Sequence, residues 1–370
     1  MSIDTFEIFA VATPGMEDLL RDEAVERGFA DAVTVPGGVT FQGGWPDVWR
    51  ANLELRGASR ILARIGSFMA FHLAQLDKRS RKFPWADVLR ADVPIKVQVT
   101  CKASKIYHAG AATQRIETAL RESLGATVSP EAAMVLKVRI DDNKVTLSLD
   151  TSGESLHKRG HKEAVGKAPM RETLAALMLR QAGFDGREPV LDPMCGSGTF
   201  PIEAAEIATG LMPGRSRSFA FEQLASFDPV AWRGIKANTM PVTTDLRFYG
   251  SDRDTGTIRM SMENAERAGV GAITLFTNLP ASEARPPEGP SGLVIVNPPY
   301  GARIGNKKLL YPLYGKLGQT LLEHFKGWRV ALVTSEPPLA KATGLPWKSQ
   351  SAAIPHGGIK VWLWQTGVLR

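Results

Sequence analysis

The sequence has little of what membrane proteins, disulfide-rich secreted proteins and metalloproteins contain. Its 370 residues include two cysteines, Cys101 and Cys195, too few for a disulfide framework or a cysteine-rich zinc site, and its six histidines show no zinc-type spacing. No apolar run approaches the roughly 18 residues that a transmembrane helix requires. The N-terminal segment carries acids and lacks the basic start of a signal peptide. We therefore expect a metal-free protein of the reducing cytoplasm that does not contact a membrane.

Neither sign of charge is in strong excess. The chain has 45 basic and 38 acidic residues, a net charge of +7, and its 44% hydrophobic and 22% charged residues are typical of folded proteins. The distribution is uneven, because residues 1–70 hold 6 basic and 10 acidic residues, residues 71–150 hold 13 and 9, and residues 151–370 hold 26 and 19. An acidic first segment thus masks a net charge of +11 in the remainder, which is compatible with a polyanionic partner.

Two local runs concentrate this basic charge. One is Lys78–Lys82, which precedes Phe83 and Trp85, and the other is His157–Lys162. Basic residues beside aromatic rings are typical of a surface that contacts phosphates and stacks on bases, but a solvated surface explains either run equally well.

The first 170 residues contain two mixed α+β patterns and a connector. Residues 1–70 alternate in the order β-α-β-β-α-β, which predicts a ferredoxin-like unit. Residues 71–155 form a second unit, whose last two strands are joined by the turn Asp-Asp-Asn at 141–143. Residues 156–170 are polar, basic and glycine-containing, so they predict a connector.

From residue 171 to 370, short apolar strands alternate with helices. This pattern predicts a doubly wound parallel sheet, an α/β Rossmann-like domain. Ligands bind such sheets at the carboxyl ends of the strands, so functional residues should directly follow the apolar runs. The predicted strands are Pro189–Leu191, Arg247–Gly250, Ala272–Phe276, Leu293–Val296, Arg329–Val333 and Ile359–Trp364.

A glycine loop follows the first of these strands. The segment 192–200, Asp-Pro-Met-Cys-Gly-Ser-Gly-Thr-Phe, ends the strand and begins a helix. Glycine removes side chains where a ligand approaches the backbone, and Asp192 is placed to accept from an amine or a cation. The spacing is not that of a Walker A loop, and Pro201 stands where GxGxxG has its third glycine.

This string resembles the S-adenosylmethionine (SAM) loop of class I RNA and DNA amino-methyltransferases. The resemblance implies that Asp192 contacts the methionine amine and that the loop holds the cofactor. No basic neighbour activates Cys195, so a structural thiol is favoured over a nucleophile. The implied cofactor contacts of the loop are Asp192, Pro193, Cys195, Gly196, Gly198 and Thr199.

A second motif, Asn297-Pro298-Pro299-Tyr300, directly follows the strand Leu293–Val296. The prolines fix an extended turn and remove two donors, which leaves the Asn297 side-chain oxygen and nearby main-chain carbonyls as acceptors. An exocyclic amine of a nucleobase needs such acceptors to orient its hydrogens, and Tyr300 offers a face for stacking. A simple Asn-Pro turn is the alternative. The position after a SAM-type loop favours the functional interpretation, and the motif resembles that of methyltransferases acting on amino groups of adenine, cytosine or guanine.

Three further positions are candidate cofactor contacts. Asp252 ends the second strand, where an acid suits the ribose hydroxyls, while Asp254 can cap the next helix. Related enzymes place an acid near the end of the third strand; this chain has Asn278, whose oxygen can accept the same bond from adenine. Thr173 begins a helix that resembles the segment closing over the cofactor, although an ordinary helix start explains it as well.

The resemblance extends over almost the whole chain. It covers the ferredoxin-like unit at 1–70, a THUMP RNA-binding domain at 71–155, the connector at 156–170 and both motifs of the methyltransferase domain at 171–370. The chain resembles the THUMP-containing guanine-N2 RNA methyltransferase family, and in particular the N-terminal half of the enzyme acting on bacterial 23S ribosomal RNA. In those ribosomal members a second methyltransferase module follows; because this chain stops at Arg370, a single activity is expected.

The resemblance implies methyl transfer from SAM to N2 of a guanosine in structured RNA, with ribosomal RNA favoured over tRNA, by a monomer. The basic segment 71–170 would contact phosphates. Two alternatives stay open: an adenine-N6 nucleic-acid methyltransferase using the same tetrapeptide, and a non-catalytic SAM- or RNA-binding ribosome-assembly factor. The THUMP-like half argues against DNA, and the intact motifs argue against loss of catalysis.

Overall fold

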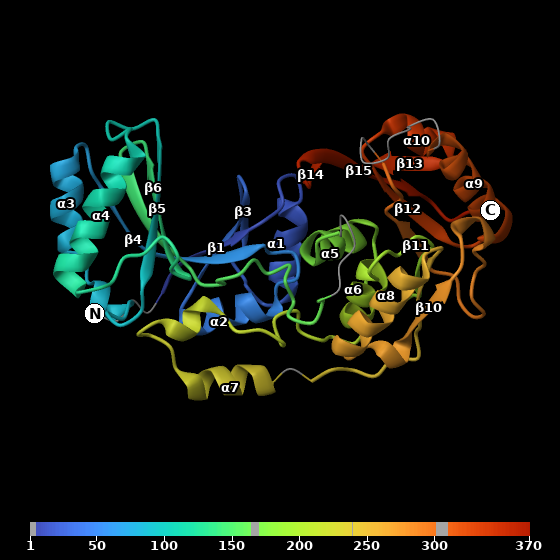
Figure 1. Cartoon of the computed structure of the whole chain (residues 1–370), viewed down its shortest axis with the longest axis horizontal. Coiled ribbons are helices and arrows are strands. Elements are labelled where there is room, and N and C mark those ends of the chain that lie inside the picture. Colours follow the sequence, from blue (N-terminus) through green and yellow to red (C-terminus); the bar gives the residue numbers. More distant parts are fainter. Residues whose placement is uncertain (1–4, 164–169, 239, 301–309) are drawn as a thin grey trace. The chain divides into compact units, whose positions relative to one another are not determined.

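The computed structural model describes residues 5–163, 170–238, 240–300 and 310–370 (Figure 1). The chain divides into two compact units. The first contains the chain up to Ala12 together with Leu20–Leu156 and Arg217–Asn238. The second contains Thr13–Leu19, His157–Ser216 and the chain beyond Asn238. Among the described residues, no helix is both long and apolar enough to cross a membrane.

The first unit is built on one seven-stranded sheet with the strand order β2-β3-β1-β4-β7-β6-β5. Its elements up to residue 155 are β1 (Phe6–Val11), α1 (Glu17–Glu26), β2 (Val33–Val35), β3 (Gly38–Gly43), α2 (Trp45–Glu54), β4 (Arg60–Met69), α3 (Leu73–Arg81), η1 (Trp85–Asp87), β5 (Ile95–Lys102), α4 (Ala109–Leu124), β6 (Met134–Asp141) and β7 (Lys144–Asp150).

The first four strands have the arrangement that the sequence predicts for a ferredoxin-like unit. β1 lies between β3 and β4 and is antiparallel to both. Alternate residues of β1, Phe6, Ile8 and Ala10, are buried, as expected of a strand with one face on a core. β4 continues into antiparallel pairing with β7, from Leu62 opposite Asp150 to Met69 opposite Lys144. The two units expected at 1–70 and 71–155 therefore share one sheet, and their boundary stays a prediction.

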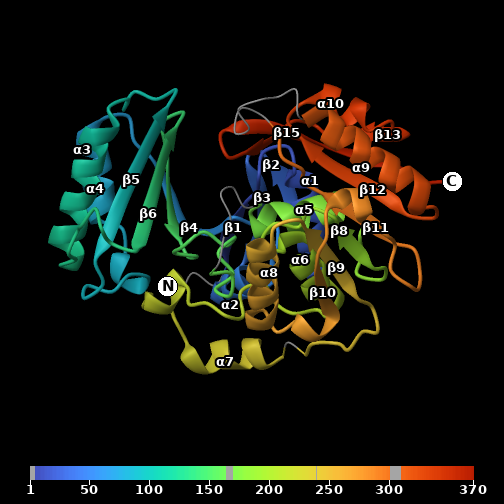
Figure 2. The ribbon, with the colours of Figure 1, turned by 45° about the vertical axis from the view of Figure 1, so that its right-hand side comes forward.

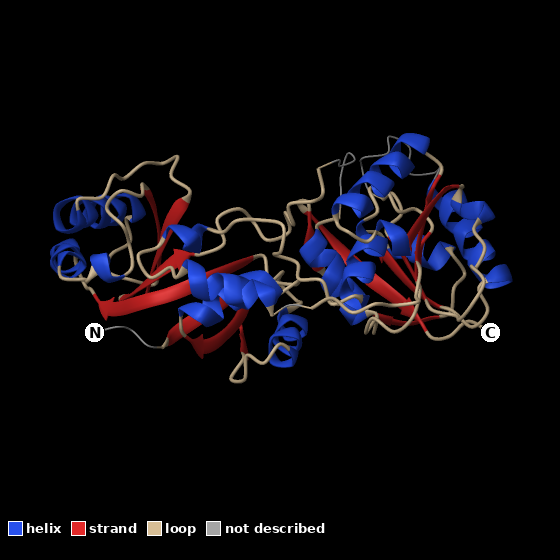
Figure 3. Ribbon diagram, turned by 90° about the horizontal axis from the view of Figure 1, so that it is seen from below, coloured by secondary structure: helices blue, strands red, loops and turns tan. Residues whose placement is uncertain are grey.

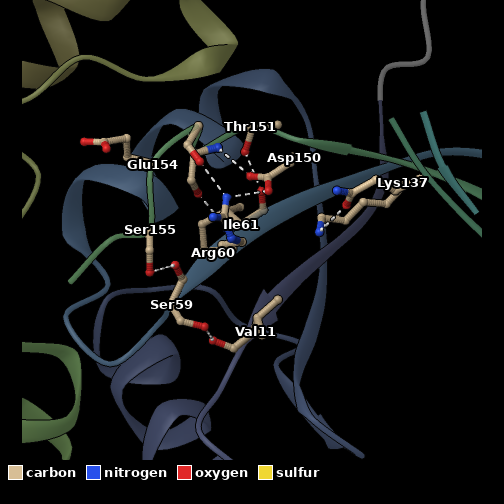
Figure 4. A network of polar contacts seen from close by, with 12 residues as sticks. Val11, Ser59, Arg60, Ile61, Lys137, Asp150, Thr151, Glu154 and Ser155 are labelled. Atoms are coloured by element: carbon tan, nitrogen blue, oxygen red, sulfur yellow. Dashed lines mark hydrogen bonds and ion pairs between the residues drawn. The ribbon is translucent and has the colours of Figure 1, made fainter. Parts of the chain in front are cut away.

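Polar contacts fix the chain where it leaves β7 (Figure 4). The Arg60 guanidinium pairs with the buried carboxylate of Asp150, and the Thr151 hydroxyl donates to the Ile61 carbonyl at 2.7 Å. Ser59 donates to the Val11 carbonyl at 3.0 Å. Burial raises the pKa of Asp150, although Arg60 and Lys137 oppose that shift. The network satisfies polar groups that would otherwise be costly in the interior.

The basic run Lys78–Lys82 lies in and directly after α3, which packs with α4 along β5 and β6 (Figure 2). Of its two aromatic neighbours, Trp85 is not available for stacking. Trp85 is 2% exposed and its indole N–H donates to the Ser80 carbonyl at 2.8 Å, while the Phe83 ring lies 4.5 Å from that of Trp85. The interpretation as a nucleic-acid surface is therefore wrong for Trp85, which belongs to the core, whereas Phe83 is half-buried and its contact with a nucleic acid stays a prediction.

A segment distant in sequence completes the first unit. Arg217–Asn238 contains η2 (Ala220–Gln223) and α7 (Pro229–Ala237), which packs with α2. The buried Phe221 ring lies 6.0 Å from Trp49 and 5.1 Å from Trp232. A truncation at residue 155 would expose this aromatic cluster, so RNA binding has to be tested on the full chain.

The second unit has an eight-stranded sheet whose main path is β10-β9-β8-β11-β12-β15-β13, with helices on both sides of it (Figure 3). Its elements are α5 (Glu172–Gln181), β8 (Val190–Asp192), α6 (Thr199–Ala208), β9 (Phe248–Asp252), α8 (Thr255–Arg267), η3 (Gly271–Ile273), β10 (Thr274–Asn278), η4 (Ala281–Glu283), β11 (Leu293–Val296), α9 (Leu310–His324), β12 (Arg329–Thr334), α10 (Pro337–Ala342), β13 (Trp347–Gln350), β14 (Ile354–His356) and β15 (Ile359–Thr366).

The expected Rossmann-like α/β domain is confirmed, with one correction. β8 to β12 are parallel to their neighbours, but β15 runs antiparallel to both β12 and β13, so the sheet is mixed and not entirely parallel. Two strands, β13 and β14, were not expected. The side chains of β13 are all at least partly exposed, so this edge strand lacks the apolar pattern by which strands are found.

Candidate active site

The carboxyl ends of β8, β9 and β11 bring the two predicted motifs together. These strands are adjacent and parallel, so Asp192, Asp252 and Asn297 follow them at the same edge of the sheet. A pocket of about 580 Å³ opens there. The side chains and backbone that line it are those of Pro193, Met194, Asp252, Arg253, Pro280, Ala281, Ser282, Asn297, Pro299, Leu310, Leu313, Lys316 and Leu317.

The two glycines of the loop occupy different surroundings. Gly196 has φ +54° and no atom of the described chain within 4 Å of the position that a Cβ would take. Gly198 has φ +82°, and its Cβ would lie 3.1 to 3.2 Å from Ile202, Ser261 and Phe276. Gly196 therefore leaves open space beside the loop, whereas Gly198 permits close packing at the start of α6. A cofactor contact of Gly198 stays a prediction that packing alone also explains.

Two carboxylates follow neighbouring strands. Asp192 is 2% exposed, and burial raises its pKa to about 8, against the hydrogen bond that Met194 N–H donates to it at 3.0 Å. The nearby Asp252 carboxylate adds to this rise. Asp252 accepts from the Gly196 N–H at 3.2 Å and from the Asp254 N–H at 3.0 Å, which fixes the loop to the end of β9. No ion pair joins Asp192 to a cation within the part of the chain that the structure describes, so its buried carboxyl is suited to a positively charged ligand.

Asn297 presents an unused acceptor at the pocket. Its Oδ1 is buried and has no hydrogen-bond partner among the residues that the structure describes. Leaving a buried acceptor unsatisfied costs on the order of 1–3 kcal/mol, so such an atom is typical of a site that a ligand completes. The turn that holds it is anchored by Tyr314 of α9, whose hydroxyl donates to the Pro299 carbonyl at 3.3 Å.

Two residues of the Asn-Pro-Pro-Tyr motif, Pro298 and Tyr300, are not among the described residues that line the pocket. Pro298 is buried, and Tyr300 is 8% exposed. Base stacking by Tyr300 stays a prediction. Residues 301–309, which include the final glycine of the motif, lie outside the described chain.

The other candidate cofactor residues are engaged within the protein. Asn278 donates to the Asp252 carbonyl at 3.0 Å and accepts from the Thr255 hydroxyl at 3.3 Å. Thr173 is 3% exposed in the first turn of α5, and Lys162 donates to the Thr199 hydroxyl at 2.7 Å. Their contacts with a cofactor stay predictions.

Cys195 packs as a small apolar residue. Its thiol is buried, and burial together with the carboxylates of Asp192 and Asp252 raises its pKa well above the ordinary value. The sulfur lies 3.9 Å from the Ser261 hydroxyl. A protonated thiol held in this way is a poor nucleophile, in agreement with the structural role expected for it.

The second basic run, His157–Lys162, is buried in large part within the second unit. Arg159 is 1% exposed and pairs with the equally buried Glu203 of α6 at 3.0 Å. Lys162 pairs with Glu172 at 2.7 Å, and His161 lies 3.5 Å from Glu206. Both expected interpretations, a solvated surface and an RNA surface, are therefore wrong for Arg159, His161 and Lys162.

Sequence reasoning missed these anchoring residues. Tyr314 belongs to no motif and lies 0% exposed in α9, and Lys162 occurs in a run whose composition suggested exposure. The only sequence signal is indirect: Glu203 and Glu206 on α6 are acids in an otherwise apolar helix, which indicates buried partners of opposite charge.

Two known protein families match the chain. Residues 159–359 match the family described as "RMKL-like, methyltransferase domain", and residues 7–62 match the family described as "RlmL ferredoxin-like domain". Over 357 residues the chain is 36% identical to the "Ribosomal RNA large subunit methyltransferase K/L" of Allochromatium vinosum. This similarity covers 91% of the chain and 48% of the relative, so the chain spans about half the length of the curated relative it matches.

Solved structures share the fold along nearly the whole chain. A protein of Listeria monocytogenes, described as a predicted N6-adenine-specific DNA methylase, is 28% identical with a TM-score of 0.87, over 98% of this chain and 96% of that one. A second protein, SMU.472, was solved as a methyltransferase in complex with SAH. It is 26% identical with a TM-score of 0.86, over 99% of both chains.

Proposed function

The chain belongs to the RMKL-like methyltransferase family, and on that premise we propose that it transfers a methyl group from SAM to the exocyclic N2 of a guanosine in structured RNA. The matches bear out the resemblance for the methyltransferase domain and for the ferredoxin-like unit, while the THUMP domain and the guanine-N2 specificity stay predictions. The observation that carries the proposal is the buried Oδ1 of Asn297, which has no hydrogen-bond partner among the described residues and lies at a pocket that Asp252 also lines. Ribosomal RNA is favoured because the relative that covers most of the chain is named for it.

The residues in and beside the pocket fit SAM, although Asp192 and Gly196, which share a loop with the lining residues Pro193 and Met194, are not themselves among the described residues that line it. Gly196 leaves open space beside the loop, and the buried Asp192 carboxyl can neutralise the ammonium group of the methionine part. Asp252 extends from the end of β9, where an acid accepts from ribose hydroxyls in nucleoside-binding α/β sheets. A neighbour with the same fold binds SAH. When bound, SAM supplies an electrophilic methyl group on its sulfonium.

The pKa of Asp192 predicts how SAH affinity depends on pH. The folded-state pKa of about 8 lies above the unfolded value of about 3.9, so below pH 8 the ligand-free carboxyl is protonated and must release its proton to pair with an ammonium group. We expect SAH affinity to rise by up to about tenfold per pH unit as pH approaches 8 from below. Calorimetry in buffers of different ionisation enthalpy measures both the affinity and the released proton.

Asp192→Asn is the matched control for this pH dependence of SAH affinity. It should bind SAH more weakly and without proton release. In the ligand-free wild type, the stability that the protonated carboxyl contributes is present at low pH and declines as pH rises toward 8, and the asparagine variant should not show this decline. A wild-type affinity that is flat from pH 6 to 8 would refute the assignment of the ammonium group to Asp192.

The acceptors at the turn explain the choice of an amino group. The Asn297 oxygen and the Pro298 carbonyl can hold the two hydrogens of an –NH₂ group, so that its nitrogen lone pair points at the methyl group. Guanine N2 is a weak nucleophile because its lone pair is delocalised into the ring, so catalysis depends on proximity and orientation. Transfer would form the new C–N bond as the C–S bond of the sulfonium breaks, with SAH as the leaving group, and one amino proton would pass to solvent. A paired base must first be flipped out, which is cheapest in a loop.

An adenine-N6 activity is the second candidate, because the same acceptors suit the adenine amine and a structural neighbour is described as an N6-adenine methylase. The chain is incubated with labelled SAM and RNA lacking modifications, and the RNA is digested to nucleosides for mass spectrometry. We expect N2-methylguanosine from large-subunit ribosomal RNA and little from tRNA. N6-methyladenosine as the sole product would overturn the proposed base.

A further inference from the structure

Three loops meet at one end of the seven-stranded sheet: residues 69–72 after β4, residues 102–107 after β5, and residues 141–144 between β6 and β7. We call these residues the three-loop surface. Two of its rings are exposed to solvent, Tyr107 to 84% and Phe71 to 42%. A single exposed ring is common on protein surfaces; what distinguishes these two is that they lie on loops joined to one another and carrying exposed lysines.

The loops are held rigidly by one residue. Asn143 accepts from the Lys105 N–H through its side chain at 2.9 Å, donates its own N–H to the Ser104 hydroxyl at 2.9 Å, and accepts from the Ala70 N–H through its carbonyl at 2.9 Å. It therefore joins all three loops. Asp142 and Asn143 have positive φ, as the two central residues of a tight hairpin turn do, and Asp and Asn tolerate this conformation. Ala103, with φ +44°, is the residue for which the left-handed conformation is costly. The hydrogen bonds of Asn143 and this turn fix the three loops relative to one another.

The charges beside the rings are mostly positive. Lys102, Lys105 and Lys144 are exposed, and the Lys105 ammonium lies 5.6 Å from the centre of the Phe71 ring. The Asp141 carboxylate is paired with Arg139. The remaining charged residues of the surface are three lysines and one acid, Asp142, so its charge is mainly positive. Lysines beside aromatic rings are the combination with which single-strand binders contact phosphates and stack on bases. Two rings are too small an apolar patch for a stable protein interface.

We propose that the three-loop surface binds an unpaired segment of the RNA substrate, with Tyr107 and Phe71 stacking on bases and the lysines contacting phosphates. This inference rests on the proposed function in one respect: the expected RNA substrate is the reason for choosing single-stranded RNA and not single-stranded DNA. Paired bases already stack on one another within the helix and cannot offer their faces to a side chain. A duplex would therefore meet only the lysines, and the rings would contribute nothing to its binding.

The test measures binding of the full chain to a labelled single-stranded oligoribonucleotide of about 12 nucleotides and to the same strand in a duplex. Tyr107→Ala should weaken single-strand binding about tenfold, within the range expected for loss of one base–aromatic stack, and leave duplex binding nearly unchanged. Tyr107→Phe keeps the ring and should bind as the wild type does. Lys105→Gln should lower the slope of log affinity against log salt by about 0.7.

Folding and function are separated by controls. Tyr107 is almost fully exposed, so its removal should not change thermal unfolding, and Val25→Ala on α1, 51% exposed, gives a matched apolar control that should bind both probes normally. Equal single-strand affinity of Tyr107→Ala and wild type, or equal losses on both probes, would overturn the proposal. If the wild type methylates no RNA but the ring still governs single-strand binding, the surface stands and the proposed function fails.

Discussion

Replacement of Asn297 by alanine is expected to lower the rate of methyl transfer by about 100-fold or more while leaving the affinity for SAM nearly unchanged. The side-chain oxygen would hold a hydrogen of the acceptor amine, so its removal lets the nitrogen turn away from the methyl group. Asp252 and the glycine loop, which we assign to the cofactor, are untouched by the substitution. Single-turnover kinetics with saturating RNA separate the chemical step from binding.

The same substitution makes a second, independent prediction about stability. Because Oδ1 of Asn297 is buried without a partner in the described chain, the ligand-free protein bears the cost of an unsatisfied acceptor. Asn297→Ala removes that acceptor, so thermal unfolding should occur at the same or a higher temperature. Loss of activity together with higher stability is the mark of a functional group, whereas a structural residue would lose both.

Asn297→Asp is the informative control, because a carboxylate keeps an acceptor at the same position. It should retain more activity than the alanine variant. Wild-type rates in Asn297→Ala, or loss of activity through loss of SAM binding, would exclude the proposed role of the side chain.

The site could be predicted from the sequence because its residues lie where strands end. A parallel sheet brings the residues at the ends of β8, β9 and β11 to one edge whatever the intervening loops are, so Asp192, Asp252 and Asn297 were singled out by position and chemistry together with the resemblance of the two motifs to a known family. The pocket wall from α9 was not predicted. Tyr314 and Leu310 reach the site through packing of a helix, and nothing in their local sequence distinguishes them from other core residues.

Burial of charge was the main property that the sequence did not reveal. The run at 157–162 has the composition of an exposed segment, and only the fold brings Glu203 of α6 and Glu172 of α5 against it. Trp85 is likewise buried, although it directly follows a basic helix. For the run at 157–162, contacts with helices distant in sequence, which no local pattern encodes, decided between the two interpretations.

The Arg159–Glu203 pair gives the largest expected effect on stability. Both side chains are 1% exposed, and removing one partner of a buried pair typically costs about 3–5 kcal/mol because the other charge is left in the interior. Glu203→Ala should therefore lower the unfolding temperature of the second unit by roughly 6–20 °C. Arg187→Ala, in the exposed pair with Asp185, is the matched control and should change it little.

Removing Arg159 and removing Glu203 should have different effects on the stability of the protein. A guanidinium stays charged at any accessible pH, so Glu203→Ala leaves a buried cation that no proton can neutralise, although Glu206 and Glu172 still attract it. Arg159→Ala instead leaves a carboxylate, which can take up a proton. Because a proton can neutralise a carboxylate but not a guanidinium, we expect Arg159→Ala to lose less stability than Glu203→Ala at the acidic end of the range. Thermal unfolding of both variants between pH 5 and 8 measures this difference; equal losses at every pH would show that the pair contributes by packing and not by charge.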